Sequence, residues 1–296
     1  MNPSNARTYA HFSWFNTLRE VIHALRSRKE TQQVIATVLE RLHRDESRIS
    51  QLLGRPFQQL NMLEIGAGQR MERARYFAIH NQVTVLEQDV ISHGINLASY
   101  WRMIQQNGFG RFIKTVGRKA LLVDYHNQQS WKSALNVKQL PLPKILQGSI
   151  CEVQPPLESF DLIVSWSTFE HLPDPQQALH HVIQALKPGG AFLIGIHLYT
   201  SNSGHHDIRA FTDGDCPPWG HLRSSTCHLI QPSSYLNQWR LREWRSLFTQ
   251  AAPGHQEFLE FYGSVEQLTP DLRAELEEYS LEELYTVDAF YLWRKP

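Results

Sequence analysis

Apolar and polar residues alternate along this chain in blocks that predict helices first and strands afterwards. Over residues 1 to about 55, apolar residues recur at helical spacing in two runs, namely Leu18, Val21, Ile22 and Leu25, then Val34, Ile35, Val38, Leu39 and Leu42. The break Gly54-Arg55-Pro56 ends this region. Residues 1–55 are therefore expected to form an N-terminal helical extension to the domain over 56–296.

Short apolar runs in the rest of the chain predict the strands of a sheet. They lie near residues 60 to 65 and in the segments "VTVLE", "KILQG", "FDLIVSW" and "AFLIGIHLY". Between the last two of these, Asp174 can cap a helix that has Pro175 in its first turn. A helix around "SSYLNQWRLREWRSLF" and two closing strands, "EFLEFYGS" and "YTVDAFYLWRKP", complete the pattern.

This alternation predicts an α/β fold: a Rossmann-like, doubly wound and mostly parallel sheet with helices on both faces. Residues 91–144, after the second strand, exceed what such a unit needs and are interpreted as an insertion. Residues 200 to 225 are rich in Gly, Pro, His and aromatic residues, so a loop is expected there.

Composition narrows the class of protein. The 296 residues are 42% apolar, and 29 Lys and Arg balance 29 Asp and Glu, so no basic field favours nucleic acid. Three cysteines without a C-x-x-C pair fit a reducing compartment. The N-terminus lacks a signal-peptide core, and no apolar run approaches the roughly 20 residues of a membrane span. A cytoplasmic protein without an integral membrane segment is expected.

The turn after the first strand raises the question of a nucleotide cofactor. It reads Gly66-Ala67-Gly68-Gln69-Arg70-Met71, which lacks the third glycine of the dinucleotide fingerprint. Glu64 would repel a pyrophosphate but suits a cationic sulfonium ligand. Glu87, at the end of the second strand, can accept hydrogen bonds from both hydroxyls of an unphosphorylated ribose. Together these features favour S-adenosylmethionine over NAD.

The sequence here resembles the class I S-adenosylmethionine-dependent methyltransferases. "LEIGAG", "VTVLEQD", "FDLIVSWSTFEHLPDPQQAL" and "LKPGGAFLIGI" are similar to that family's motifs in the right order, over about residues 60–90 and 145–198. The resemblance implies a set of cofactor-binding residues: Glu64, Gly66, Ala67, Gly68, Glu87, Gln88, Ser149, Ile150, Ser165 and Trp166. The family often has Asp where Ser149 stands. A serine hydroxyl can also accept a hydrogen bond from the adenine amino group.

The acceptor of the methyl group is expected to be a small molecule. The Pro-Pro-aromatic motif of the family's nucleic-acid amino methyltransferases is replaced by Ser165-Trp166-Ser167-Thr168-Phe169. His171, in "STFEHLPD", lies near the expected methyl position, and some small-molecule members place a catalytic histidine after this strand. His171 is therefore the candidate base, with a bracing role for the loop as the alternative.

Residues farther along the chain are candidates for the acceptor pocket. In the loop after the fifth strand these are His197, Tyr199, Trp219 and His221. The histidine spacing matches no standard metal template, so no metal site is expected. Residues 91–147 carry eight basic residues against one acid, so the insertion, with Arg111 and Lys114, is interpreted as an acceptor lid. A solvated basic face is the alternative.

Two functions are compatible with these patterns. The first is methyl transfer to a small molecule, most simply at a hydroxyl oxygen of an anionic sugar, a lipid-linked glycan or a secondary metabolite. The second is a methyltransferase-like binding or partner subunit that has lost the chemistry. The intact Glu64, Gly66, Gly68 and Glu87 favour the first.

Overall fold

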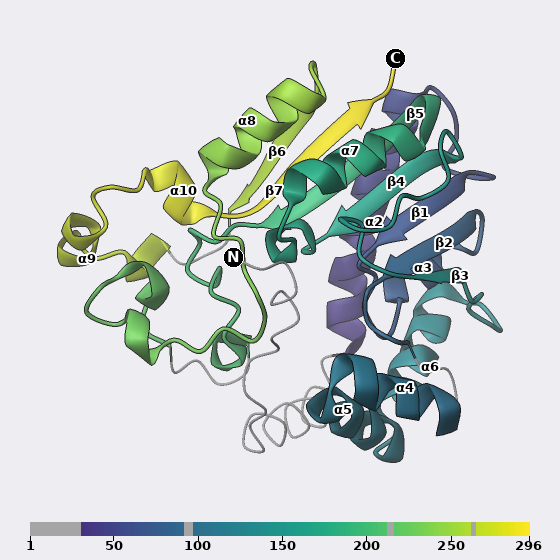
Figure 1. Cartoon of the computed structure of the whole chain (residues 1–296), viewed down its shortest axis with the longest axis horizontal. Coiled ribbons are helices and arrows are strands. Elements are labelled where there is room, and N and C mark those ends of the chain that lie inside the picture. The colour runs from purple at the N-terminus through teal and green to yellow at the C-terminus, as the bar shows by residue number, and fades with distance from the viewer. Residues whose placement is uncertain (1–30, 92–96, 212–215, 262–264) are drawn as a thin grey trace.

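The computed structural model of the chain describes residues 31–91, 97–211, 216–261 and 265–296 (Figure 1). Within these residues a seven-stranded sheet has the order β3-β2-β1-β4-β5-β7-β6. The strands are β1 Asn61–Ile65, β2 Gln82–Glu87, β3 Lys144–Gln147, β4 Phe160–Trp166, β5 Leu186–His197, β6 Gln256–Phe261 and β7 Thr286–Arg294. The first five are parallel, whereas β7 runs antiparallel to both β5 and β6. All the strands expected from the sequence are thus present, and the α/β fold class is confirmed.

The order of the strands places the site. From β1 the chain moves outward through β2 to β3 and then returns to pair β4 with the other side of β1, with Leu63 beside Ile163. The loops that leave β1 and β4 therefore begin at the same edge of the sheet, on neighbouring strands. Ligands of open α/β sheets bind at such a reversal, outside the carboxyl ends of the strands.

Helices cover both faces of the sheet (Figure 1). On one face, α7 (Pro175–Ala185) and α8 (Leu241–Ala251) bury residues such as Leu179 and Trp244 against β4, β5 and β7. On the other face lie α2 (Thr31–Leu53), α3 (Glu72–Phe77) and α6 (Val123–Leu135). The apolar stripe of α2, which includes Ile35, Leu42 and Ile49, packs in one cluster with the sheet. This N-terminal helix is therefore part of the core.

The segments between and after these elements are also largely helical. Between β2 and β3 lie α4 (Leu97–Asn107), α5 (Phe109–Ala120) and α6. The expected loop contains short 3-10 helices, which continue beyond it: η4 Ile208–Phe211, η5 Gly220–Leu222 and η6 Cys227–Leu229. The remaining short helices are η3 Phe169–His171, η7 Val265–Gln267, α9 Pro270–Glu275 and α10 Leu281–Tyr285. The helix predicted around Leu18–Leu25 lies outside the described residues. No helix in the described ranges is both long and apolar enough to cross a membrane.

Asp174 provides a test of how α7 begins. Its carboxylate accepts a hydrogen bond from the Gln177 backbone N–H at 2.9 Å, which satisfies an amide that the helix itself cannot. We expect Asp174→Ala to lower the free energy of unfolding by about 1 kcal/mol, and the melting temperature by about 2–4 °C. Asp174→Ser keeps a capping oxygen and should retain most of the stability in the same denaturation experiment. An equal loss in both variants would show that the cap is not the cause.

Candidate functional site

The loop that leaves β1 is shaped by two glycines. Gly66 and Gly68 have φ of +72° and +69°, a backbone region that other residues enter only with strain. A Cβ on Gly66 would lie 2.1 Å from the Thr168 Oγ1 atom. The loops after β1 and β4 therefore touch at a point where only hydrogen fits.

Glu87 lies against this loop from the end of β2. Its Oε2 accepts a hydrogen bond from the Gly68 N–H at 2.8 Å. Its backbone carbonyl accepts one from the Gly148 N–H at 3.0 Å, which draws in the turn after β3. That turn holds Ser149 and the buried Ile150. The structure thus brings together the residues that the sequence assigned to the cofactor from three different strands.

Glu64 is a carboxylate buried in the sheet beneath the same loop. Its side chain is only 3% exposed. Burial, together with the nearby charge of Glu87, raises the pKa of Glu64 to about 7, although Arg73 opposes the shift. Among the described residues its Oε2 has no hydrogen-bond partner. Such an oxygen is costly unless a ligand satisfies it.

Two hollows flank Arg73. The larger, of about 310 Å³, is lined by Ala67, Gly68 and the residues up to Arg73, with Val38 and Arg118 opposite. The smaller, of about 60 Å³, lies at the carboxyl ends of β4 and β5, and its polar lining consists of Arg41, Arg44, Asp45, Arg73, Ser167 and Asp288. Between them the Arg73 guanidinium lies over the Trp166 ring, 5.0 Å from its centroid.

The two predicted cofactor residues at the end of β4 take part in packing. Ser165 is fully buried, and its hydroxyl donates to the Ile65 carbonyl at 3.1 Å. Trp166 stacks on Phe77 with the ring centroids 5.8 Å apart, and its edge reaches the smaller hollow. Gln88 is exposed. Of these three residues, only Trp166 lines one of the two hollows.

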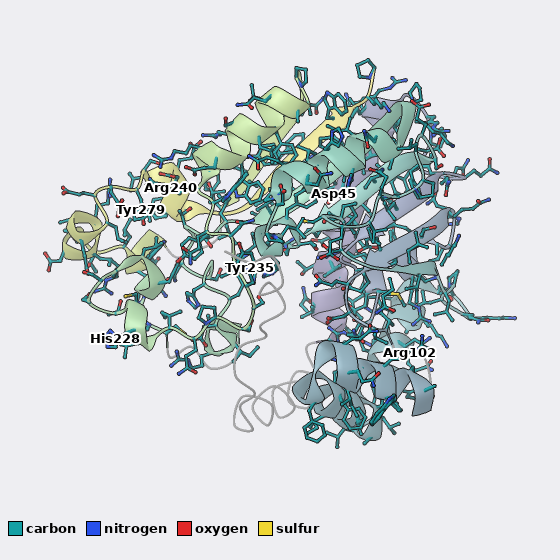
Figure 2. The ribbon with its side chains drawn as sticks, viewed as in Figure 1. Asp45, Arg102, His228, Tyr235, Arg240 and Tyr279 are labelled. Carbon is teal, nitrogen blue, oxygen red and sulfur yellow. The ribbon has the colours of Figure 1, made fainter. Side chains whose placement is uncertain are left out.

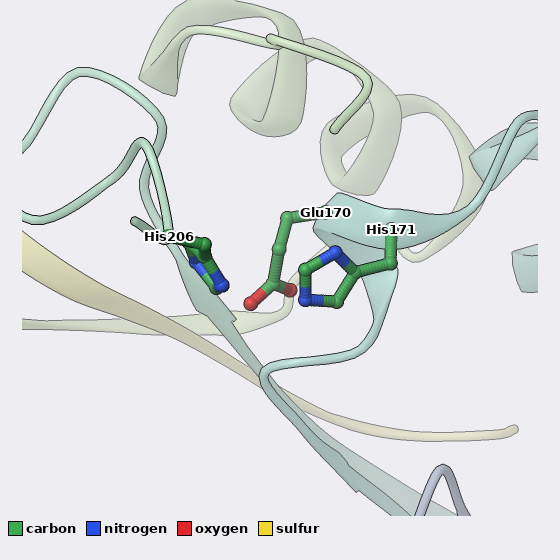
Figure 3. Close-up of side chains that lie close together, drawn as sticks. All are labelled: Glu170, His171 and His206. Atoms are coloured by element: carbon green, nitrogen blue, oxygen red, sulfur yellow. The ribbon is translucent and has the colours of Figure 1, made fainter. Parts of the chain in front are cut away.

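The segment after β4 brings a carboxylate and two histidines together, as Figure 3 shows. One ligand atom each from Glu170, His171 and His206 lie within 4.8 Å of one another. The His171 Nδ1 atom lies 2.8 Å from the Tyr235 carbonyl, which can only accept, so Nδ1 carries the proton and Nε2 presents a lone pair. Burial lowers the pKa of His171 and keeps its ring neutral.

Glu170 and His206 complete this cluster. Glu170 is 2% exposed, and its Oε1 accepts a hydrogen bond from the His197 N–H at 3.3 Å. Its Oε2 has no hydrogen-bond partner among the described residues, and burial raises the pKa of Glu170 well above its usual range. Burial and four neighbouring histidines lower the pKa of His206 to about 2. The group thus pairs an uncompensated carboxyl group with two neutral rings.

Of the predicted acceptor residues, His197 adjoins the cluster through a ring contact, and His221 and Tyr199 contact each other. His206 lies edge-on to both His171 and His197, at centroid distances of 4.8 and 4.9 Å. His197 contacts the carboxylate of Asp288, a residue that also lines the smaller hollow. His221 donates to the Tyr199 carbonyl, and burial lowers the pKa of His221 to about 3.

The structure does not bring every predicted acceptor residue to this place. Trp219 is fully buried in a separate cluster with Leu276 and Leu284, and its indole N–H donates to the Leu284 carbonyl. The side chains of Arg111 and Lys114, on α5, lie outside the described part of the chain.

Several site residues escaped the sequence analysis. Arg41, Arg44 and Asp45, the last labelled in Figure 2, lie on α2. Nothing local in the sequence shows which edge of the sheet that helix reaches. Glu170 could have been found from the sequence, because it is an acid shortly after a buried strand and directly before His171.

Comparison with known proteins places the chain in a family. A family profile described as "Methyltransferase domain" matches residues 29–259, which is more than half of the chain. No curated protein matches.

Three solved structures illustrate the likeness. A phosphoethanolamine N-methyltransferase 2 from Haemonchus contortus, solved with phosphomonomethylethanolamine and S-adenosylhomocysteine, is 15% identical over 86% of this chain and 53% of its own, with a TM-score of 0.45. A putative methyltransferase from Bacillus halodurans is 13% identical over 85% and 99%, with a TM-score of 0.42. A putative sarcosine dimethylglycine methyltransferase from Galdieria sulphuraria is 15% identical over 92% and 86%, with a TM-score of 0.41.

The strand order, the glycine loop beside Glu87 and the matching family profile lead to one conclusion. The chain belongs to the class I S-adenosylmethionine-dependent methyltransferases.

Proposed function

We propose that this protein transfers the methyl group of S-adenosylmethionine to a hydroxyl oxygen of a small anionic molecule. The cofactor supplies a methyl carbon that its sulfonium sulfur activates. The acceptor oxygen attacks this carbon in line with the carbon–sulfur bond, and the sulfur leaves as a neutral thioether. The chain must then hold the two reactants in line, exclude water and take a proton from the acceptor.

The observation that carries this proposal is the orphaned oxygen of Glu64. A buried carboxylate beside a glycine loop repels phosphate but stabilises a cation, and S-adenosylmethionine presents both an ammonium and a sulfonium group. The residues present therefore fit the cofactor. In this assignment Gly66, Ala67 and Gly68 line its methionine part, and Glu87 accepts the ribose hydroxyls in place of the Gly68 N–H.

The remaining cofactor residues are assigned by their place around this loop. The turn with Ser149 and Ile150 adjoins Glu87 and would face the adenine, which Gln88 would flank. Ser165 and Trp166 would shape the end of β4 beside the sulfonium.

The acceptor is proposed to enter through the smaller hollow. Its lining includes Arg41 and Arg73, whose guanidinium groups suit a carboxylate or phosphate, and Arg44, which pairs with Glu260 and Asp45. Asp288 joins this hollow to His197 and hence to the histidines around His171. Tyr199 and His221 would extend the acceptor site, and Trp219 would support it by packing the loop from within.

His171 is the proposed proton acceptor. When the acceptor oxygen attacks, its O–H bond breaks and the proton moves to the lone pair of Nε2, while the Tyr235 carbonyl holds Nδ1–H. A neutral ring at physiological pH is what this role requires.

The insertion at 91–144, with Arg111 and Lys114, is proposed as an acceptor lid. Its helices α4 to α6 lie between β2 and β3 in the chain, and α6 packs on α2, the helix that lines both hollows. Their basic residues favour the same anionic acceptors as the arginines of α2.

Binding of S-adenosylhomocysteine tests the cofactor site. At about 100 times its dissociation constant it should stabilise the fold by about 2.7 kcal/mol, which thermal unfolding detects as a shift of several degrees. Glu87→Ala should weaken this effect, because the ribose loses its acceptor. A clear shift with NAD and none with S-adenosylhomocysteine would contradict the assignment.

Proton release on binding tests Glu64 directly. A carboxyl group whose pKa is raised to about 7 is largely protonated at pH 6.5, and a bound cation lowers that pKa, so binding should release a fraction of one proton. Titration calorimetry of S-adenosylmethionine at pH 6.5, in two buffers of different ionisation enthalpy, measures it. Glu64→Gln should release none. Proton uptake, or equal release by the variant, would be inconsistent with this role.

Replacement of His171 tests the proton transfer. Loss of a general base costs about 10²–10⁴-fold in rate, so His171→Ala should lower turnover by that factor while S-adenosylhomocysteine affinity stays within a few-fold. Since burial lowers the pKa of His171 below 6.5, the parent's rate should fall only at pH values below that point. His180→Ala, which removes an exposed histidine from α7, should change neither. Near-parent turnover in His171→Ala would show that His171 only braces the loop.

Cofactor binding without methyl transfer to any anionic hydroxyl acceptor would favour the alternative function, a binding or partner subunit without catalytic activity.

A further inference from the structure

We propose that Glu170, His171 and His206 form a binding site for a divalent transition-metal ion, with Zn²⁺ the best-suited occupant. Two imidazoles and one carboxylate with open positions are the ligand set of catalytic zinc sites. The proposal rests on the proposed function only for the use of the ion, and its binding test is independent of methyl transfer. It revises the sequence expectation that the chain holds no metal.

The geometry of the three side chains is close to that of a ligand set. Their ligand atoms lie within 4.8 Å of one another, and the two rings point toward the carboxylate from opposite sides (Figure 3). Zinc–ligand bonds are about 2.0–2.2 Å long, which brings tetrahedral ligands to about 3.4 Å apart. Small rotations of the side chains would therefore close the site.

The unpartnered Oε2 atom of Glu170 is a second feature that points to a bound metal ion. It is a carboxylate with a 2% exposed side chain, and its Oε2 has no hydrogen-bond partner in the described residues although Oε1 has one. A buried carboxylate oxygen costs free energy unless a hydrogen bond or a cation compensates it. Metal coordination would satisfy this oxygen, and no side chain of opposite charge is paired with Glu170 in the described chain.

The surroundings hold the ring of His171 in the manner of a metal ligand and fix the backbone of His206. Such ligands nearly always donate their second ring N–H to a carbonyl or carboxylate, which fixes the tautomer and aims the other nitrogen. His171 does this through Nδ1 and the Tyr235 carbonyl, with the Ser234 hydroxyl 3.2 Å away. His206 is held with φ of +51°, and its backbone carbonyl accepts from the Ser233 N–H. Left-handed residues of this kind cluster at functional sites.

The location suggests what the ion would do. The cluster lies where β4 and β5 end, and the contact of His197 with Asp288 joins it to the smaller hollow. A divalent ion there would bind the acceptor hydroxyl as a Lewis acid and make it lose its proton more readily. The Nε2 atom of His171 would then hold the ion, and the proton would pass to water, whereas in the ion-free protein Nε2 takes the proton itself. An acceptor with neighbouring oxygens, such as a hydroxy acid or a vicinal diol, fits such an ion.

Calorimetric titration of the untagged full chain with ZnCl₂, and separately with CoCl₂, tests the site. We expect one ion per chain in the parent. Loss of a second-shell partner alone costs about 10–100-fold in affinity, so loss of a ligand in Glu170→Gln or His206→Ala should cost at least about 100-fold. His180→Ala is the matched control and should bind as the parent does.

Two readouts keep the test independent of folding and of activity. Circular dichroism and thermal unfolding without metal show whether each variant is folded, and His206→Gln replaces His206→Ala if the latter is not. Equal zinc affinity in the parent and in both ligand variants would overturn the proposal, as would a parent that binds no zinc. Zinc binding that depends on Glu170 in a protein that does not bind S-adenosylhomocysteine would uphold the metal site and contradict the proposed function.

Discussion

The contact between Gly66 and Thr168 is the constraint on which the site depends. Thr168 Oγ1 reaches the Trp166 carbonyl at 3.1 Å, and the space it occupies is the space a Cβ on Gly66 would need. Because the loops after β1 and β4 touch here, the glycine loop and the Glu170–His171 segment are held next to each other. One loop belongs to the proposed cofactor site and the other to the proposed acceptor site. The two sites can lie this close together because Gly66 has no side chain.

Two buried carboxyl groups without a compensating charge lie close to the site. Glu64 and Glu170 are both buried at the carboxyl edge of the sheet, and each has an oxygen without a partner in the described residues. Their pKa values are raised by burial, so each weakens the fold as the pH rises through its titration range. The free-energy cost of such a buried carboxyl group is tolerated where a bound cation offsets it. We assign a sulfonium amino acid to Glu64 and a divalent metal ion to Glu170.

The sequence predicted those parts of the fold that local patterns determine. The strands, the capped helix at Asp174 and the glycine loop followed from periodicity and turn residues, and the structure contains all of them. The hollow lined by Arg41, Arg44 and Asp288 could not be predicted, because it forms only when α2 packs across β5 and β7. Trp219 lies in a segment rich in Gly and Pro that suggested an open loop, yet a small separate core encloses its ring. The histidines are widely spaced in sequence, and only the folded loop brings His206 to His171.

A structure of the protein with S-adenosylhomocysteine bound is the most direct test of this account. We expect the ribose hydroxyls to bind the Glu87 carboxylate and the ammonium group to lie next to Glu64. The sulfur should face the Glu170–His171 segment across the contact between Gly66 and Thr168. A ligand whose ribose lies away from Glu87, or whose sulfur points away from His171, would contradict it.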